Sequence, residues 1–383
     1  MTIRMRFEHL DMLRGGAAIL VLIEHTRAYV FLAKGELQAA SILTKLFYAC
    51  TSLGHQAVIV FFALSGFLVG GQAIEGMISG KWSWKDYALR RLTRLWIVLL
   101  PAISVTLLLD ILGQMLTGGV GYDGSFGGIY PSWPNSSAPL DHSLSTIFGN
   151  IFFLQTILTP VLGSNGPLWS LANEFWYYVI FPLLASIFLL PQRSVMVALS
   201  CVLLGMLLTM LPLELLKGGL IWVLGAASAF MTRRTVRHRF WKSWIVRMAI
   251  GLCVLISIGL VEISWAGIGD LLLGFSIALA LPVLAGMDSP TAIYSRIARS
   301  ISEISFTLYV THFPLLTFLV LVNLAPVRRS PSMDGFLIFG MLVLGALLFA
   351  ALLWQCFERH THRIYQRLSL KLSSRVTVAA SPN

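Results

Sequence analysis

The sequence contains few charged residues. Only 12% of its 383 residues are Asp, Glu, Lys or Arg, whereas a soluble globular domain carries about a quarter. Hydrophobic residues make up 57% of the chain, and the mean hydropathy is +0.79. So little polar surface cannot cover a water-facing shell. The composition therefore predicts an integral membrane protein in a lipid bilayer and excludes a disordered chain, a secreted disulfide scaffold and a nucleic-acid-binding domain.

The chain is also poor in cysteine. Its four cysteines lie far apart, without a Cys-x-x-Cys pair or a zinc spacing, so we expect packing residues and no metal site. A Walker loop is absent as well. Segment 119–124 fits the pattern Gly-x-Gly-x-x-Gly, but no strand precedes it and no helix follows it, so it predicts a flexible loop and not a dinucleotide site.

Long apolar runs account for most of the sequence. A helix that spans a bilayer needs about 20 mostly apolar residues. The first run passes through Glu24, His25 and Arg27 without a small-residue cleavage site, which predicts an uncleaved span and not a signal peptide. We expect an all-α membrane protein, with one domain over residues 1–373, a disordered tail over 374–383, and a bundle of about ten transmembrane helices. The ten predicted spans are 13–33, 54–74, 93–113, 169–190, 194–212, 216–232, 244–262, 267–286, 303–324 and 334–357.

Basic residues sort the loops into two sets. The net charge is +11, and 22 of the 28 Lys and Arg residues fall on the side that holds both termini. By the positive-inside rule this side is the cytoplasm. The longest loop, 114–143, then lies on the extracytoplasmic side. Segment 141–160 is interpreted as an interfacial or re-entrant helix, because a span there would place the termini on opposite sides.

Polar side chains inside a membrane are costly and often functional. Arg14 and His25 are eleven positions apart in the first span, so they share one helix face about 16 Å apart along the axis. Taken singly, Arg14 is equally typical of a cytoplasmic anchor and His25 of a hydrogen-bonded bundle histidine. Their shared face, beside Glu24, favours function.

Two other spans carry polar stripes. Helical spacing places a carboxylate on one stripe of the fourth span and a histidine on a stripe of the ninth. Pro314, near that histidine, is able to free a backbone carbonyl. Ser302 and Ser305 are also typical of contacts between helices. The residues of the two stripes are Ser170, Asn173, Glu174 and Tyr177 in the fourth span and Ser302, Ser305, Tyr309 and His312 in the ninth.

The second span and the segment after it form a third polar region. Ser65 and Gly66 are small enough for close helix packing, and the cytoplasmic loop that follows carries Arg90, Arg91 and Arg94. Arginine binds phosphate well because its planar donors match the oxyanion. The arginine cluster has two explanations. It is either a positive-inside signal that orients the protein in the membrane or a binding site for a phosphate-bearing substrate on the cytoplasmic side.

These residues, in this order, resemble the acyltransferase 3 family of bacterial multispanning membrane acyltransferases, along nearly the whole chain. Ala57 and Ile97 stand where many members have Gly and Pro, which affects packing more than chemistry. The matching segments are Asp11-Met-Leu-Arg14-Gly15 with His25; Phe61-Phe62-x-x-Ser65-Gly66-Phe67; Arg91-x-x-Arg94; Trp169-Ser170-Leu171-x-x-Glu174 with Tyr177; and Ser305-x-x-x-Tyr309-x-x-His312-x-Pro314.

The resemblance implies an O-acyltransferase of the bacterial inner membrane. Such an enzyme moves an acyl group, usually acetyl, from cytoplasmic acyl-CoA to a hydroxyl of a glycan or another extracytoplasmic acceptor, without a permanently bound cofactor. A proton-coupled transporter, or a membrane acyltransferase of the other large kind acting on lipid or protein, would share buried polar residues. The chain lacks the inverted halves typical of many transporters.

The implied roles can be assigned residue by residue. His25 is the general base on the acceptor hydroxyl, with direct transfer from the thioester. The alternative is a transient acyl-histidine intermediate. His312 is a second catalytic residue. Glu174 or Glu24 would orient the imidazolium. The predicted phosphate ligands are Arg14, Arg91 and Arg94, and the predicted pore or structural residues are Asp11, Ser65, Ser170, Tyr177, Ser305 and Tyr309.

Loop 116–143 is the expected entrance for the acceptor. Aromatic faces flanked by hydrogen-bonding groups suit sugar rings. The alternative is a flexible cover with interfacial aromatics. The residues concerned are Tyr122, Asp123, Tyr130, Trp133 and Asn135.

Overall fold

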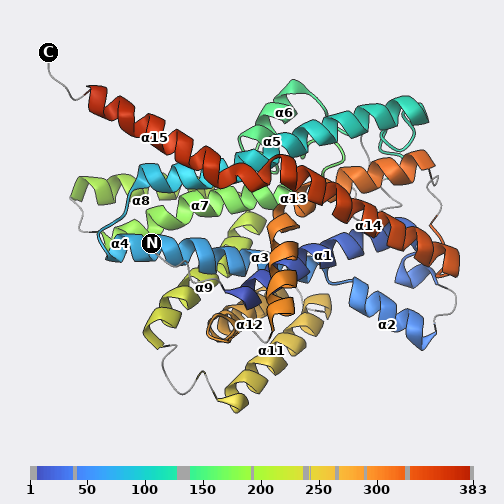
Figure 1. Ribbon diagram of the computed structural model, residues 1–383, viewed down its shortest axis with the longest axis horizontal. Coiled ribbons are helices and arrows are strands. Elements are labelled where there is room, and N and C mark those ends of the chain that lie inside the picture. The colour runs from blue at the N-terminus through green and yellow to red at the C-terminus, as the bar shows by residue number, and fades with distance from the viewer. Residues whose placement is uncertain are drawn as a thin grey trace.

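The computed structural model describes residues 7–37, 41–126, 139–190, 194–235, 241, 243–263, 267–288, 291–323 and 328–379. These residues are almost entirely helical (Figure 1). In this part of the chain there is no strand, only two isolated bridges, Phe31 with Arg329 and Gln155 with Thr159. The predicted all-α class is confirmed.

The two longest connections are 118–143, between α5 and α6, and 152–167, between α6 and α7. Pro101, Pro182, Pro282 and Pro314 lie inside four of the helices. The α-helices are α1 (Glu8–Val30), α2 (Ile42–Thr51), α3 (Gly54–Ser65), α4 (Gly71–Ile78), α5 (Trp84–Thr117), α6 (Leu144–Ile151), α7 (Leu168–Leu189), α8 (Ser194–Met210), α9 (Leu213–Thr235), α11 (Trp244–Ile263), α12 (Ile268–Ala285), α13 (Ala292–Asn323), α14 (Met333–Cys356) and α15 (Thr361–Ala379). Three short elements are the 3-10 helices η1 (Lys34–Glu36) and η3 (Glu358–His360) and the π-helical segment η2 (Gly66–Gly70).

Eight helical stretches among the described residues are long and apolar enough to cross a membrane. They indicate a multi-pass membrane protein. The two further predicted spans correspond to α1, which has the length but carries Glu24 and Arg27, and to α8, whose apolar part is the short segment Val197–Met210. The count of ten and the cytoplasmic placement of both termini stay predictions.

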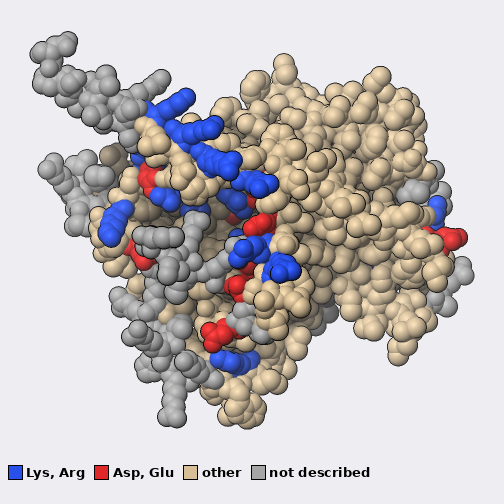
Figure 2. All heavy atoms as spheres, viewed as in Figure 1, with Lys and Arg blue, Asp and Glu red and all other residues tan. Residues whose placement is uncertain are grey.

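The molecular surface is divided by charge. Figure 2 shows Lys and Arg gathered along α15 and on the neighbouring surface, with acidic residues among them. A broad uncharged area separates this region from a few charges at the opposite edge of the view. This distribution is typical of a protein with a lipid-facing belt and one strongly basic side.

Helices α1 and α13 pack side by side in the same direction. Hydrogen bonds between them join residues that are 285 to 291 positions apart, and in four of these pairs the difference is 287 or 288. A difference that stays so nearly constant arises only when two helices run parallel and in register. Parallel packing is expected for the first and ninth spans, since both are odd-numbered. These four pairs are Glu8 with Ser295, Arg14 with Ser302, His25 with His312 and Tyr29 with Thr317.

A second close contact joins η2 and α3 to α9. The fully buried Trp222 packs its ring on Tyr177, Tyr178 and Phe181. A Cβ added at Gly66 would lie 1.9 Å from the backbone oxygen of Trp222. Glycine is therefore required here for the backbones to approach.

Three segments differ from the sequence-based expectation. Arg90, Arg91 and Arg94 lie on α5, not in a loop, because α5 already begins at Trp84, where the Ser83 hydroxyl accepts the backbone N–H of Asp86. Segment 141–160 is helical only over α6, and turns follow it. Residues 374–379, predicted to be disordered, continue α15, whereas 380–383 lie outside the described residues.

The cysteines also differ from the expectation. All four are free and exposed on helix surfaces, so they do not pack in the protein interior. On α2, α8, α11 and α14, helices of a membrane protein, an exposed thiol is an apolar surface group rather than a core residue.

The contact between η2 and α9 leads to a stability prediction. Gly66→Ala places a Cβ against the Trp222 carbonyl, so the two backbones must separate. We expect the free energy of unfolding to fall by about 1–3 kcal/mol, as for other overpacked cores. Thermal unfolding in detergent measures the change. Gly259→Ala on α11 is the matched control, since nothing lies within 4 Å of its added Cβ; equal stability of the two variants would contradict the prediction.

Candidate active site

Two histidines from the parallel helix pair meet inside the protein. His25 Nδ1 lies 2.8 Å from His312 Nε2, and the two rings stack with centroids 5.1 Å apart and planes 8° from parallel. His312 is buried, and the edge of the Phe313 ring packs on His25 at 5.0 Å. The structure thus joins two of the three predicted catalytic residues in one hydrogen bond.

A backbone carbonyl determines which nitrogens carry protons in this pair. His312 Nδ1 lies 2.9 Å from the Leu308 oxygen, which only accepts, so Nδ1 of neutral His312 must carry the proton. Its Nε2 is then the acceptor, and His25 Nδ1 donates to it. Neutral His25 therefore keeps its lone pair on Nε2. This nitrogen has the form that a general base requires.

Tyr309 and Ser170 form the next contact along α13. The Tyr309 hydroxyl lies 2.7 Å from Ser170 Oγ, and both side chains are buried. The Tyr309 ring is 6.2 Å from the His312 ring. The two predicted polar stripes therefore meet next to the histidine pair, as α7 packs against this part of the bundle.

Glu174 lies in a separate cluster. Its Oε1 accepts the Ser65 hydroxyl at 2.8 Å and also the Tyr178 hydroxyl. Trp222 Nε1 donates to Ser65 Oγ at 3.1 Å. This carboxylate thus joins α3 and α9 to α7. Among the described residues it makes no hydrogen bond to His25, and its role in orienting that ring stays a prediction.

Three other predicted residues have local roles. Glu24 accepts the backbone N–H of Gly54 at the start of α3. The Tyr177 hydroxyl donates to the Leu215 carbonyl at 2.7 Å, which joins α7 to α9, and Ser305 donates to the Ser302 carbonyl at 2.7 Å. The sequence pattern did not identify these partners, and the predicted roles of the three residues stay predictions.

Arg14 and Arg94 already have carboxylate partners. Arg14 contacts Asp11 at 2.7 Å, and its Nε donates to Ser302 at 2.9 Å. Arg94 lies 2.9 Å from Glu358, which is only 4% exposed. Both arginines therefore hold helices together, whatever else they bind.

Arg91 differs from the other two arginines. Its guanidinium donates to the Gln72 side chain at 3.1 Å and lies over the rings of Tyr87 and Tyr178 at 5.6 and 5.8 Å. Its Nε is buried and has no hydrogen-bond acceptor among the described residues. No ion pair of Arg91 occurs in the described ranges either. Among these three arginines, it is the one without a carboxylate partner in the described part of the chain.

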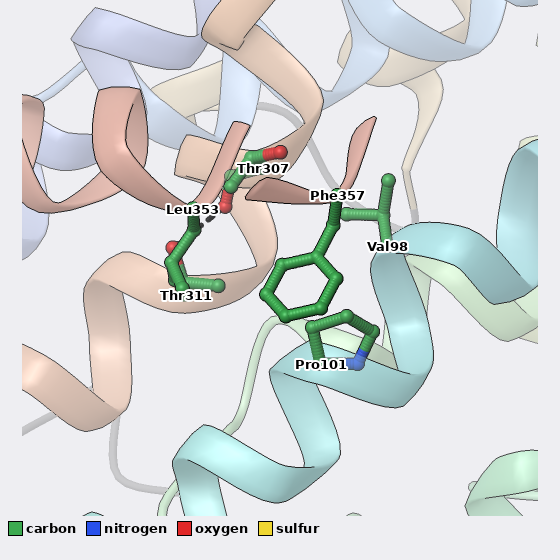
Figure 3. A pocket seen from close by; sticks show the side chains of 6 residues that line it. All are labelled: Val98, Pro101, Thr307, Thr311, Leu353 and Phe357. Atoms are coloured by element: carbon green, nitrogen blue, oxygen red, sulfur yellow. Dashed lines mark hydrogen bonds between the residues drawn. The ribbon is translucent and has the colours of Figure 1, made fainter. Parts of the chain in front are cut away.

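A small pocket lies beside Glu358 (Figure 3). It contains none of the predicted site residues, and its walls are mostly apolar. Thr307, which lines it, donates its hydroxyl at 2.6 Å and its backbone N–H at 3.2 Å to Glu358. Its lining residues are Val98, Pro101, Thr307, Thr311, Leu353 and Phe357.

The sequence-based argument missed a buried carboxylate at the other end of α5. Asp110 is fully buried and accepts the Ser164 N–H at 2.8 Å, the Ser164 hydroxyl at 2.6 Å and His142 Nε2 at 2.8 Å. A charge inside the apolar run 93–113 was the available signal. Asn165, which directly follows Ser164, donates a hydrogen bond to the Val310 carbonyl on α13.

The predicted acceptor loop is described only in part. Tyr122 is 3% exposed and packs in the core against α5 and α13, so it is not a surface aromatic. Asp123 accepts hydrogen bonds from Gly121 and Ser125, which fix the turn and lower its pKa. Tyr130, Trp133 and Asn135 lie outside the described residues.

The comparison with protein families gives one match. The acyltransferase domain of the acyltransferase 3 type matches residues 7–355. The chain belongs to this family. No curated protein and no solved structure matches it. The resemblance read from the five segments is confirmed, and this membrane acyltransferase carries the histidine pair within the matched region. Among its described residues, no group of three or more His, Cys, Asp or Glu is arranged to hold a metal ion.

The Arg94–Glu358 pair leads to a second stability prediction. Glu358→Ala in this acyltransferase leaves the Arg94 charge and the Thr307 N–H and hydroxyl without their acceptor. We expect a loss of about 2 kcal/mol in the free energy of unfolding, the scale for hydrogen bonds to a charged group. Urea or thermal unfolding in detergent measures it. The control Glu214→Ala removes an exposed pair with Lys217 and should have almost no effect; equal effects would argue against a structural pair at Glu358.

Proposed function

We propose that this acyltransferase moves an acyl group, usually acetyl, from cytoplasmic acyl-CoA to a hydroxyl on the extracytoplasmic side of a bacterial inner membrane. The observation that carries the proposal is the hydrogen-bonded pair of His25 and His312 on two parallel helices, with Arg14 on the same face of α1. A base inside the bundle and cations at one end suit a reaction between an anionic donor and an acceptor that arrives from the other face.

In the proposed chemical step, His25 acts as the general base. His25 Nε2 removes the proton of the acceptor hydroxyl while the oxygen attacks the thioester carbonyl. The new C–O bond forms, the C–S bond breaks, and the proton passes from His25 to the departing CoA thiolate. His312 accepts the His25 Nδ1–H throughout, which keeps the reactive lone pair on Nε2 and stabilises the imidazolium.

The donor phosphates are assigned first to Arg91, and Arg14 and Arg94 are weaker candidates because each already has a carboxylate partner. The phosphates of CoA need planar, paired donors, and Arg91 has buried hydrogen-bonding capacity without a carboxylate partner among the described residues. Arg94 is retained as a weaker candidate, because Glu358 already neutralises it.

The acceptor is proposed to be a glycan or a similar polar hydroxyl compound. A polar acceptor avoids the lipid belt and reaches His25 through the outer end of the bundle, where segment 139–167 lies against α5 and α13. Residues of loop 116–143 that point to solvent are the proposed first contacts. Tyr122 is not among them, since it belongs to the core.

The base assignment predicts the effect of removing His25. His25→Ala should lower the rate of acyl transfer at least 10²-fold, the usual scale for a general base. Transfer of radiolabelled acetyl from acetyl-CoA in inside-out vesicles measures the rate. His55→Ala is the control, because His55 is an exposed histidine that bonds Asp270 and should leave the rate unchanged. More than about a tenth of the wild-type rate in His25→Ala would exclude this role.

The donor assignment predicts a difference among the arginines. Lys keeps the charge but loses the paired donors. Arg91→Lys should weaken acetyl-CoA binding about tenfold, whereas Arg94→Lys should leave binding nearly unchanged because a lysine still pairs with Glu358. Equilibrium binding of acetyl-CoA to the detergent-solubilised protein measures both. An equal loss at the two positions would show that Arg94 also contacts the donor.

A further inference from the structure

Pro314 leaves one carbonyl of the catalytic helix without its usual partner. Proline has no N–H, so the Val310 oxygen four residues earlier receives no intrahelical bond from position 314. Val310 is completely buried, and an unpaired carbonyl there would be costly. The side-chain Nδ2 of Asn165, 2.8 Å away, donates to this oxygen.

The orientation of the Asn165 amide is determined by its surroundings. Its second N–H donates to Thr106 Oγ1 at 2.9 Å, and the Thr106 hydroxyl proton is used on the Ala102 carbonyl at 2.8 Å. Both neighbours of Nδ2 are therefore acceptors. A reversed amide would place its oxygen against two other oxygens, so only one orientation is stable.

Asn165 is in turn fixed by the residue before it. Ser164 donates its N–H and its hydroxyl to the buried carboxylate of Asp110 on α5. His142 Nε2 contacts Oδ2 of the same carboxylate, the oxygen that also accepts the Ser164 N–H. The segment before α7 is thus anchored to α5, and its amide reaches across to α13.

We propose that Asn165 is a positioning residue of the acyl-transfer site. The turn it holds contains both Leu308, whose carbonyl fixes His312, and His312 itself, with Val310 between them. Asn165 replaces the helical hydrogen bond that Pro314 removes, and so it sets the position from which His312 Nε2 accepts the hydrogen bond of the His25 Nδ1–H. This role rests on the proposed function and adds a residue that acts from outside α1 and α13.

The test is a double-mutant cycle between Asn165 and Pro314. Asn165→Ala leaves the Val310 carbonyl unpaired, whereas Pro314→Ala supplies a backbone N–H that can bond it. We expect Asn165→Ala to lower kcat about tenfold or more, since a shift of about 1 Å in a catalytic group can cost 10²-fold. The KM and the binding constant for acetyl-CoA should not change. In the Pro314→Ala background, the same substitution should change kcat less than about twofold.

Unfolding of the same four proteins provides a second readout that requires no acyl donor. The stability cycle should show coupling between Asn165 and Pro314. Asn150→Ala is the control, because Asn150 is an equally buried asparagine whose amide bonds Thr146 and Pro160. It should lower stability equally in both backgrounds.

Three results would count against the inference. Equal kcat losses in the two backgrounds would overturn it, and so would a raised KM with unchanged kcat. Coupling in stability without coupling in kcat would show that Asn165 is structural only. A wild-type protein without transfer activity would instead contradict the proposed function, and the stability cycle tells these two failures apart.

Discussion

An imidazole inside a membrane bundle has to find its hydrogen bonds within the protein. A buried ring nitrogen without a partner is costly, so each ring nitrogen in this contact depends on a neighbour of the correct type. The Leu308 carbonyl fixes His312, and His312 fixes His25. Leu308 and His312 lie on α13, whereas His25 lies on α1. The parallel register of these two helices is therefore the constraint on which the site depends.

The same requirement explains the buried polar residues around the pair. Pro314 leaves a carbonyl unpaired, and Asn165 satisfies it from another element. The carboxylate of Asp110, within an apolar helix, has three hydrogen-bond partners. They are the N–H and the hydroxyl of Ser164, the residue before Asn165, and the ring Nε2 of His142. Each polar group is costly alone, and together they fix one arrangement of this end of the bundle.

Helical periodicity was sufficient to predict which residues share a face, but not which faces meet. The pattern on the ninth span identified His312 and Tyr309, and the first span identified Arg14 and His25. The partner of His25 could not be found in this way, because the register of two helices depends on packing of side chains 287 positions apart. Glu174 was assigned to the imidazole for the same reason, although Tyr178, one turn further along α7, takes its carboxylate.

Charge alone could not distinguish the predicted phosphate-binding arginines from one another. Arg91 and Arg94 are one turn apart and look equivalent in the sequence, yet Glu358 neutralises only Arg94. That acid lies 264 positions away, beyond the reach of any local motif. With Arg14 paired to Asp11 and Arg94 to Glu358, positive charge without a carboxylate partner is concentrated at Arg91 among these three. The proposed anionic donor would therefore meet its strongest attraction at one point on α5, while the paired arginines join α1, α5 and α13 near the histidine pair.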